Sequence, residues 1–158
     1  MSGTCISVQA GARATDKTLM ASFLSAVSKA GPGARFELVL EPSGQTVVPD
    51  LEVAVDSATR KKGLLGRDGL ASGTGLVIAP TNAVHTFFMR FPIDIVFVTR
   101  DGEVVKISSA VRAWRMAASL RGYAVIELGA GEAARAGLKV GDQVTARLHE
   151  SLDAGSFV

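Results

Sequence analysis

The sequence predicts a mainly β domain: a small barrel-like or folded-over antiparallel sheet with one or two short helices and an N-terminal helical appendage. Two observations predict this fold class. From Arg35 onward, apolar and polar residues alternate with the period of strands. Turn residues, such as Pro-Ser-Gly at 42–44 and Asp-Gly at 101–102, separate these runs at short intervals. Many short strands with little helix are typical of small barrels and folded-over sheets.

The N-terminal part differs from the rest of the chain. Residues 16–30 carry apolar side chains at helical spacing, and Gly-Pro-Gly at 31–33 then ends the helix. The pattern is compatible with a helix packed on the domain and with a loose appendage. We therefore divide the chain into an N-terminal appendage at 1–34, a β domain at 35–150 and a C-terminal tail at 151–158.

The β domain begins with two strands, predicted over 35–41 and 46–55. Pro49 cannot donate a ladder hydrogen bond, so it excludes an uninterrupted central strand there. A short helix follows, with Ser57 as its candidate N-cap and Gly63 suited to its C-terminal end.

The second half of the domain is a series of strands. Asp101-Gly102 favours a type I′ turn, which predicts a hairpin between the strands on either side of it. A helix of one or two turns is expected between the glycines at 129–138. The remaining strands are expected at 75–80, 94–98, 103–111, 123–128 and 140–148.

Composition limits the classes of function. Seventeen basic and fifteen acidic side chains give a net charge of +2, so charge alone does not favour nucleic acid or an anionic membrane, and we expect no nucleic-acid partner. The single cysteine, Cys5, excludes an intramolecular disulfide and a CxxC motif. With only His85 and His149 available, we expect no metal and no cofactor.

No apolar run reaches the ~20 residues that a membrane span needs. Residues 18–27 resemble the apolar part of a signal peptide, but two serines interrupt them and no clear cleavage site follows. We therefore expect a cytoplasmic protein, with export as the alternative.

The most unusual stretch is 84–102, because it places His85 and Asp94 within a run of aromatic and β-branched residues. A buried polar group without a partner costs about 1–3 kcal/mol, so these side chains must be either satisfied or used. Strand alternation puts His85, Phe87 and Met89 on one face. Asp94 follows the break at Pro92, so its closeness to His85 cannot be assumed.

From these residues we expect one ligand site. His85 would face a cleft lined by Phe87 and Met89, and Asp94 would orient Arg67 or the loop through Pro92. Each residue also has a structural interpretation: His85 as a satisfied core imidazole, and Asp94 as an acceptor of backbone N–H groups that pins its loop.

A second group of candidates is Arg112, Trp114 and Arg115. Basic residues among aromatics can bind phosphates and stack bases. A solvated loop that packs Trp114 on the domain explains the same pattern.

The sequence contains no complete catalytic motif. No nucleophile motif surrounds Ser108 and Ser109, and a mixed site of His85, Asp94 and Glu127 has no diagnostic spacing. Acid–base chemistry by His85 and Asp94 remains conceivable.

Several segments together resemble the DUF192 family, in order: LEVAVDSATRKKGLLGR, GLVI, HTFFMRFPIDIVFV, DGEVV, VRAWR and YAVIELGAGEAARAGLKVGDQV. The resemblance covers about residues 50–148 and implies a compact, β-rich, barrel-like domain of prokaryotic origin in the main. It implies no established activity. Phe88 stands where members of this family often have Trp.

We therefore expect a module that binds a small molecule or peptide near His85. One alternative is a metal-independent hydrolase or other enzyme that uses His85 and Asp94. The other is a structural or protein-interaction domain with His85 in the core. An open cleft with converging polar groups around His85 would favour the first two, and full burial the third.

Overall fold

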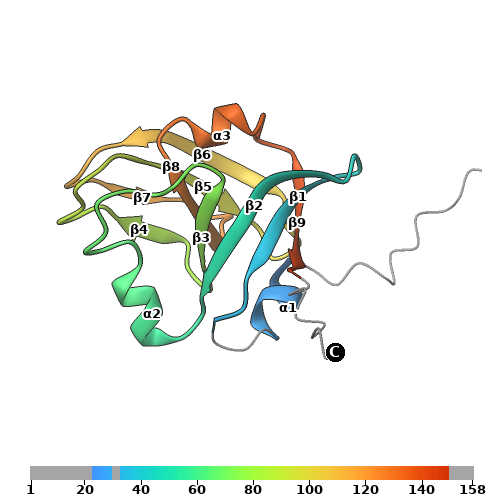
Figure 1. The fold of residues 1–158 in the computed structure, drawn as a ribbon, viewed down its shortest axis with the longest axis horizontal. Coiled ribbons are helices and arrows are strands. Elements are labelled where there is room, and N and C mark those ends of the chain that lie inside the picture. The colour runs from blue at the N-terminus through green and yellow to red at the C-terminus, as the bar shows by residue number, and fades with distance from the viewer. Residues whose placement is uncertain (1–22, 30–32, 150–158) are drawn as a thin grey trace, which may run out of the picture.

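The computed structural model describes residues 23–29 and 33–149. Within these ranges the fold is mainly β, as Figure 1 shows, and the expected fold class is confirmed. The elements are α1 (Phe23–Ser28), β1 (Phe36–Glu41), β2 (Gln45–Ala54), α2 (Ser57–Lys62), β3 (Thr74–Ile78), β4 (Ala83–His85), β5 (Ile93–Val98), β6 (Val104–Val111), β7 (Met116–Ala118), β8 (Ala124–Gly129), α3 (Glu132–Arg135) and β9 (Gln143–Leu148). None of these helices is long and apolar enough to span a bilayer.

Among the described residues, seven strands form one sheet in the order β6-β5-β8-β3-β2-β1-β9, and β4 pairs with β7 in a separate ribbon. The large sheet is mixed rather than purely antiparallel, because β2 and β3 run parallel and are joined by the crossover that contains α2. It is also open, although its two edge strands approach at one corner. There Glu103 bridges to Gln143, and the Val144 N–H donates to Gly102 O at 2.9 Å.

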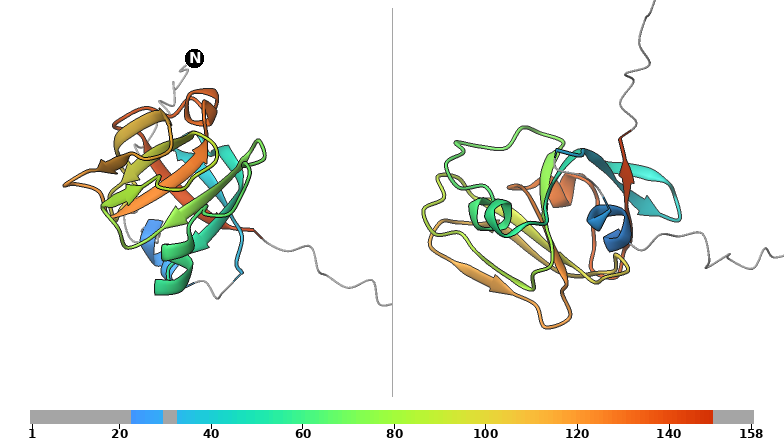
Figure 2. Two further views of the ribbon diagram at one scale, coloured as in Figure 1. Left: turned by 90° about the vertical axis from the view of Figure 1, so that its left-hand side faces the viewer. Right: turned by 90° about the horizontal axis from the view of Figure 1, so that it is seen from below.

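The helices lie at the two ends of the curved sheet. In Figure 1, α3 lies at the upper end, whereas α1 and α2 lie at the lower end. Figure 2 shows the curvature from two further sides, with α2 beside β4.

Strands β5 and β8 are buried on both faces. On β5, Ile93, Ile95 and Phe97 belong to one apolar cluster, and Val96 and Val98 belong to the other. This is the alternation of a regular strand. Any polar side chain on these two strands is therefore removed from water.

Helix α1 forms part of the domain rather than hanging loosely from it. Phe23 is 1% exposed, Val27 is 0% exposed, and both belong to the core cluster that includes Phe36 and Val144. The rest of the helix predicted over 16–30 falls mostly outside the described residues, as do the tail at 151–158 and Cys5.

Two local predictions about β2 and α2 are refined. Pro49 lies within β2, but the pairing of β2 with β1 shifts register between Leu51 and Val48, so the ladder is interrupted there. The N-cap of α2 is Asp56 rather than Ser57, because the Asp56 carboxylate accepts the N–H groups of Ala58 and Thr59, both at 2.9 Å.

The predicted hairpin between β5 and β6 is confirmed, but the prediction of a type I′ turn is wrong. A type I′ turn needs positive φ at two central residues, and of the Asp101-Gly102 pair only Gly102 has it, at 93°. The Gly102 N–H donates to Thr99 O at 3.1 Å, and the Thr99 N–H donates to Glu103 O at 2.9 Å. The loop is therefore a three-residue turn that ends in a glycine bulge.

We predict that Gly102→Ala destabilises the domain by about 2–5 kcal/mol, since it combines backbone strain with overpacking. A Cβ at this position would overlap the carbonyl oxygen of Val144, at the corner where the sheet edges meet. Gly44→Ala is the matched control, because Gly44 also has positive φ, at 72°, but has open space around it. Urea unfolding measures both, and equal losses would contradict the role of the corner.

Candidate functional site

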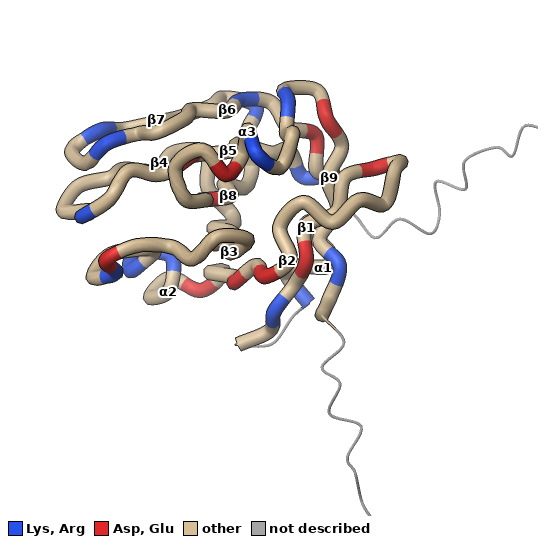
Figure 3. The backbone as a smooth tube through the Cα atoms, turned by 45° about the horizontal axis from the view of Figure 1, so that its top comes forward, with Lys and Arg blue, Asp and Glu red and all other residues tan. Residues whose placement is uncertain are grey.

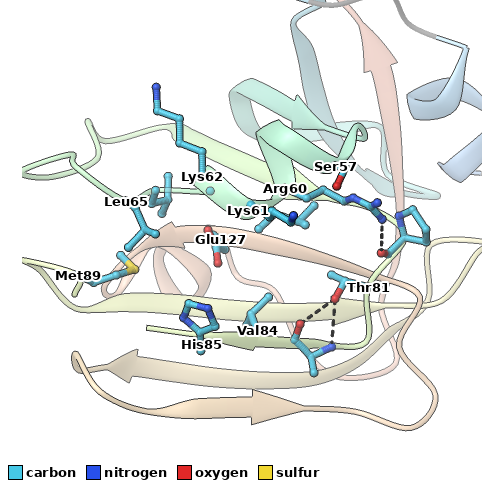
Figure 4. Close-up of a pocket in the computed structure, with 15 residues that line it drawn as sticks. Ser57, Arg60, Lys61, Lys62, Leu65, Thr81, Val84, His85, Met89 and Glu127 are labelled. Atoms are coloured by element: carbon cyan, nitrogen blue, oxygen red, sulfur yellow. Dashed lines mark hydrogen bonds between the residues drawn. The ribbon is translucent and has the colours of Figure 1, made fainter. Parts of the chain in front are cut away.

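A pocket of about 320 Å³ lies between α2 and β4. Figure 4 shows α2 on one side, His85 and Val84 of β4 on the other, and Glu127 of β8 between them. Its wall combines apolar and polar side chains, and the apolar part includes Leu64, Leu65, Ile78, Val84 and Met89.

Glu127 lies at the base of this pocket. Its neighbours across the sheet are Leu76 on β3 and Ile95 on β5, which are both apolar and buried. The residue is only 4% exposed, and no hydrogen-bond partner for its buried Oε2 is described. Gly63, at the end of α2, lies close to the same atom, since a Cβ there would be 3.9 Å from it.

Burial raises the pKa of Glu127 from its ordinary value to about 7, although the positive charge of Arg67 acts in the opposite direction. Desolvation dominates because the surrounding side chains are apolar and offer no hydrogen bond to the charged form. Glu127 therefore carries a proton for part of the time near neutral pH.

The α2 side of the pocket is basic. Figure 3 shows basic positions in blue on α2 and on the loops beside β4 and β7. Arg60 donates to Pro80 O at 3.1 Å, and in Figure 4 the Lys62 ammonium points away from Glu127. No ion pair of Arg60, Lys61 or Lys62 occurs within the described part of the chain.

His85 is exposed and lines the pocket. The interpretation of this residue as a core imidazole is therefore wrong. The physical reason is that β4 belongs to the separate ribbon, whose outer face is open, and not to the buried centre of the large sheet.

Asp94 has a structural environment. It is 0% exposed, and its carboxylate accepts the Ala110 N–H at 2.8 Å and the Ala133 N–H at 3.0 Å. It joins β5 to the end of β6 and to the start of α3, on the sheet face opposite to Ile95. The structure does not bring it together with His85 at the pocket.

Arg67 binds Glu52 instead of Asp94, so the expectation that Asp94 orients Arg67 is wrong. The guanidinium forms two hydrogen bonds to the Glu52 carboxylate, at 2.7 and 3.0 Å. This pair lowers the pKa of Glu52 and raises that of Arg67. Arg67 still acts on Glu127 through its charge.

Met89 and Phe87 are placed differently from each other. Strand β4 ends at His85, and Phe88 has a positive φ of 62°, so the alternation predicted through Met89 is broken. Met89 nevertheless lines the pocket and is 9% exposed. Phe87 lies beside the pocket and stacks on His85, with ring centroids 4.8 Å apart.

The second group of candidates lies on the loop before β7. Trp114 is 57% exposed and stacks on Phe87 at 5.6 Å, whereas Arg112 and Arg115 are exposed. None of the three lines the pocket. Among the described residues there is no group of three or more His, Cys, Asp or Glu side chains that could hold a metal ion.

The chain matches one known protein family over most of its length. The family model DUF192, described as an uncharacterized ACR, matches residues 38–146. The chain belongs to the DUF192 family. This match includes α2, β4 and Glu127, so the whole pocket lies in the DUF192 domain. A search of curated proteins finds no match.

Two crystal structures are similar to this DUF192 domain. One is from Sinorhizobium meliloti 1021 and is provisionally described as a transcription regulator, with a TM-score of 0.61 and 26% identity over 72% of this chain and 92% of that one. The other is a protein of unknown function from Novosphingobium aromaticivorans DSM 12444, with a TM-score of 0.59 and 25% identity over 75% of this chain and 95% of that one.

The sequence offers Glu127 only as one member of a mixed site with His85 and Asp94, and this site has no diagnostic spacing. A usable signal was present, because a single acidic residue interrupts the apolar strand Ala124–Gly129 on the face that it shares with Val125. What the sequence could not show is that the neighbouring strands offer this carboxyl no partner.

We predict that Asp94→Asn lowers the free energy of unfolding by about 2–4 kcal/mol, because both N–H groups lose a charged acceptor and one of them faces an amide nitrogen that cannot accept a hydrogen bond. His85→Asn should change it by less than about 1 kcal/mol, since the side chain is exposed. Urea unfolding of both variants gives the order directly. A larger loss for His85→Asn would show that the ribbon depends on this ring.

We also predict that the free energy of unfolding falls by about 3 kcal/mol between about pH 4.5 and about pH 7, because the unfolded chain releases the Glu127 proton before the folded chain does. The stabilising contribution of the protonated Glu127 to the free energy of unfolding is complete below this pH window and is lost above it. Glu127→Gln should remove it, so the variant should be the more stable protein at about pH 8. Glu41→Gln, a change of the same kind on β1, controls for other titrations, and parallel profiles for wild type and Glu127→Gln would contradict the assignment.

Proposed function

We propose that this DUF192 domain binds a small organic anion in the pocket between α2 and β4, with Glu127 as its polar anchor. The observation that supports this most directly is the Glu127 carboxyl, which is buried at the base of the pocket with no described partner for Oε2. An unsatisfied buried group of this kind costs about 1–3 kcal/mol, and a ligand that bonds to it recovers this free energy.

The size and lining of the pocket favour a small molecule over a peptide. A volume of about 320 Å³ is at the lower end of the range for small-molecule sites. Apolar and polar side chains both line the walls, whereas an extended peptide needs a row of backbone donors and acceptors along a free strand. The ligand therefore has an apolar part that Ile78, Val84 and Met89 contact.

The charges around the pocket favour an anion. Arg60 and Lys61 line the side formed by α2, His85 lines the side formed by β4, and no carboxylate neutralises the two α2 cations within the described residues. Cationic side chains along one wall raise the local concentration of anions.

The protonation of Glu127 fits the same ligand. In its protonated form the carboxyl donates a hydrogen bond, and a ligand carboxylate or phosphate oxygen can accept it. An anion that binds in this way stabilises the protonated form, so its binding takes up a proton. A cationic amine would select the ionised form and release a proton instead.

An enzyme is the second candidate, because a carboxyl with a pKa of about 7 in a pocket suits proton transfer near neutral pH. Glu127 and His85 would carry this chemistry. Asp94 has no part in it, since both of its oxygens are bonded to backbone N–H groups. Turnover of a bound ligand would distinguish this candidate from simple binding.

The test is calorimetric titration with matched acids and amines, such as propionate and propylamine, at about pH 6 and about pH 8. We expect the acid to bind and to bind more tightly at the lower pH. Glu127→Gln should keep acid binding but lose most of the pH dependence, because an amide donates at both values. Glu127→Leu should weaken binding by about 10- to 100-fold, the loss of one charge-assisted hydrogen bond.

Lys61→Gln should also weaken the binding of the acid. Lys139→Gln is the matched control, because Lys139 lies outside the pocket lining. Tighter binding of the amine, or affinity for the acid that rises with pH, would contradict the proposal. So would equal binding to wild type and to Glu127→Leu.

A further inference from the structure

Beside the pocket, four rings form a continuous surface, which we call the aromatic shelf: His85, Phe87, Phe88 and Trp114. His85 and Phe87 stack with centroids 4.8 Å apart and planes at 19°, and Phe87 and Trp114 stack at 5.6 Å and 28°. Phe88 meets Trp114 edge-on at 4.5 Å. Since His85 also lines the pocket, the aromatic shelf begins at the pocket rim.

The outer rings of the aromatic shelf are open to solvent. Phe88 is 70% exposed and Trp114 is 57% exposed, and Met116, the cross-strand partner of His85, is 74% exposed. Large apolar side chains that cluster on a surface beside a pocket mark a binding surface more often than scattered ones do.

The backbone holds these rings at a conformational cost. Phe88 and Trp114 both have a positive φ of 62°, a region that bulky residues rarely adopt. Such strain persists only where the surrounding structure fixes it, and it clusters at functional sites.

Thr86 is the residue that fixes it. It is 1% exposed, and its hydroxyl donates to Arg112 O at 2.7 Å and accepts the Arg115 N–H at 3.0 Å. Its backbone N–H donates to Arg115 O at 2.9 Å, and its carbonyl accepts the Trp114 N–H at 3.0 Å. These bonds join the two loops that carry the rings, so the aromatic shelf is organised before any ligand arrives.

We infer that the ligand of this domain is an aromatic acid, whose planar ring stacks on the aromatic shelf while its anionic group lies in the pocket. This inference rests on the proposed anion site and adds the chemical class of its ligand. A planar aromatic ring can lie flat on an exposed ring of the aromatic shelf, whereas a puckered aliphatic ring makes a smaller contact with it. Arg112 and Arg115 are exposed next to Trp114 and have no ion pair within the described residues, so their charge raises the concentration of anions near this surface.

The experiment compares benzoate with cyclohexanecarboxylate, which share an anionic group and differ in the planarity of the ring. Trp114 is the only tryptophan of the chain, so its fluorescence reports contact with the aromatic shelf directly. We expect benzoate to bind about tenfold more tightly than cyclohexanecarboxylate and to quench Trp114. The Glu127→Leu variant should bind both acids more weakly than wild type does.

Phe87→Leu keeps the fluorescent ring and should remove most of the preference for benzoate, with little effect on cyclohexanecarboxylate. Trp114→Leu, followed by calorimetry, should do the same. Leu120→Ala is the control, because Leu120 is fully exposed and is not part of the aromatic shelf.

Equal affinities for the two acids, both still weakened by Glu127→Leu, would overturn the aromatic shelf as a ring site and leave the anion pocket standing. Failure of both acids to bind would overturn the anion pocket and this inference together. Quenching of Trp114 by single-stranded oligothymidylate with no response to either acid would overturn the inference in favour of a nucleic-acid surface.

Discussion

Strands β5 and β8 run through the sheet with both faces covered, and this double burial governs every polar side chain that they carry. Each strand carries one carboxylate, on opposite faces of the sheet. Asp94 has two backbone N–H donors, whereas no partner is described for Oε2 of Glu127. Burial therefore gives the two groups different roles. The Asp94 carboxylate connects three elements through its hydrogen bonds, whereas the Glu127 carboxyl is available to a ligand in the pocket.

The fold was predictable because it depends on alternation, which the sequence carries directly. The run of strand-forming residues at 94–98 predicted β5 to within one residue, and the turn residues located the β5–β6 hairpin. The exact turn was not predictable from the Asp-Gly pair alone, since the loop is one residue longer than a type I′ turn allows and its geometry depends on the distant Val144. The parallel pairing of β2 with β3 also needs the three-dimensional crossover.

The candidate site was predictable in part. The sequence identified His85 and Met89, and both line the pocket. The sequence predicted Asp94 as the partner of Arg67, but the partner is Glu52. Strand alternation predicts the face on which a side chain lies, and it does not predict which carboxylate lies closest to Arg67. The aromatic run through Phe88 predicted a continuous strand, but β4 ends at His85, and Phe88 has a positive φ and is exposed. The hydrogen bonds of the buried Thr86 hydroxyl, which hold this segment against the loop before β7, are not visible in the sequence.

Strand β1 lies between β2 and β9, so the first strand of the domain is completed by the last. During synthesis, β1 leaves the ribosome with its partner for that edge still more than a hundred residues behind, since Phe36 pairs with Leu148. Until β9 emerges, the ladder edge of β1 and the apolar surface around Leu38 are uncovered. The domain therefore completes its sheet only after β9 has been translated, and chains that stop before β9 expose an edge prone to aggregation.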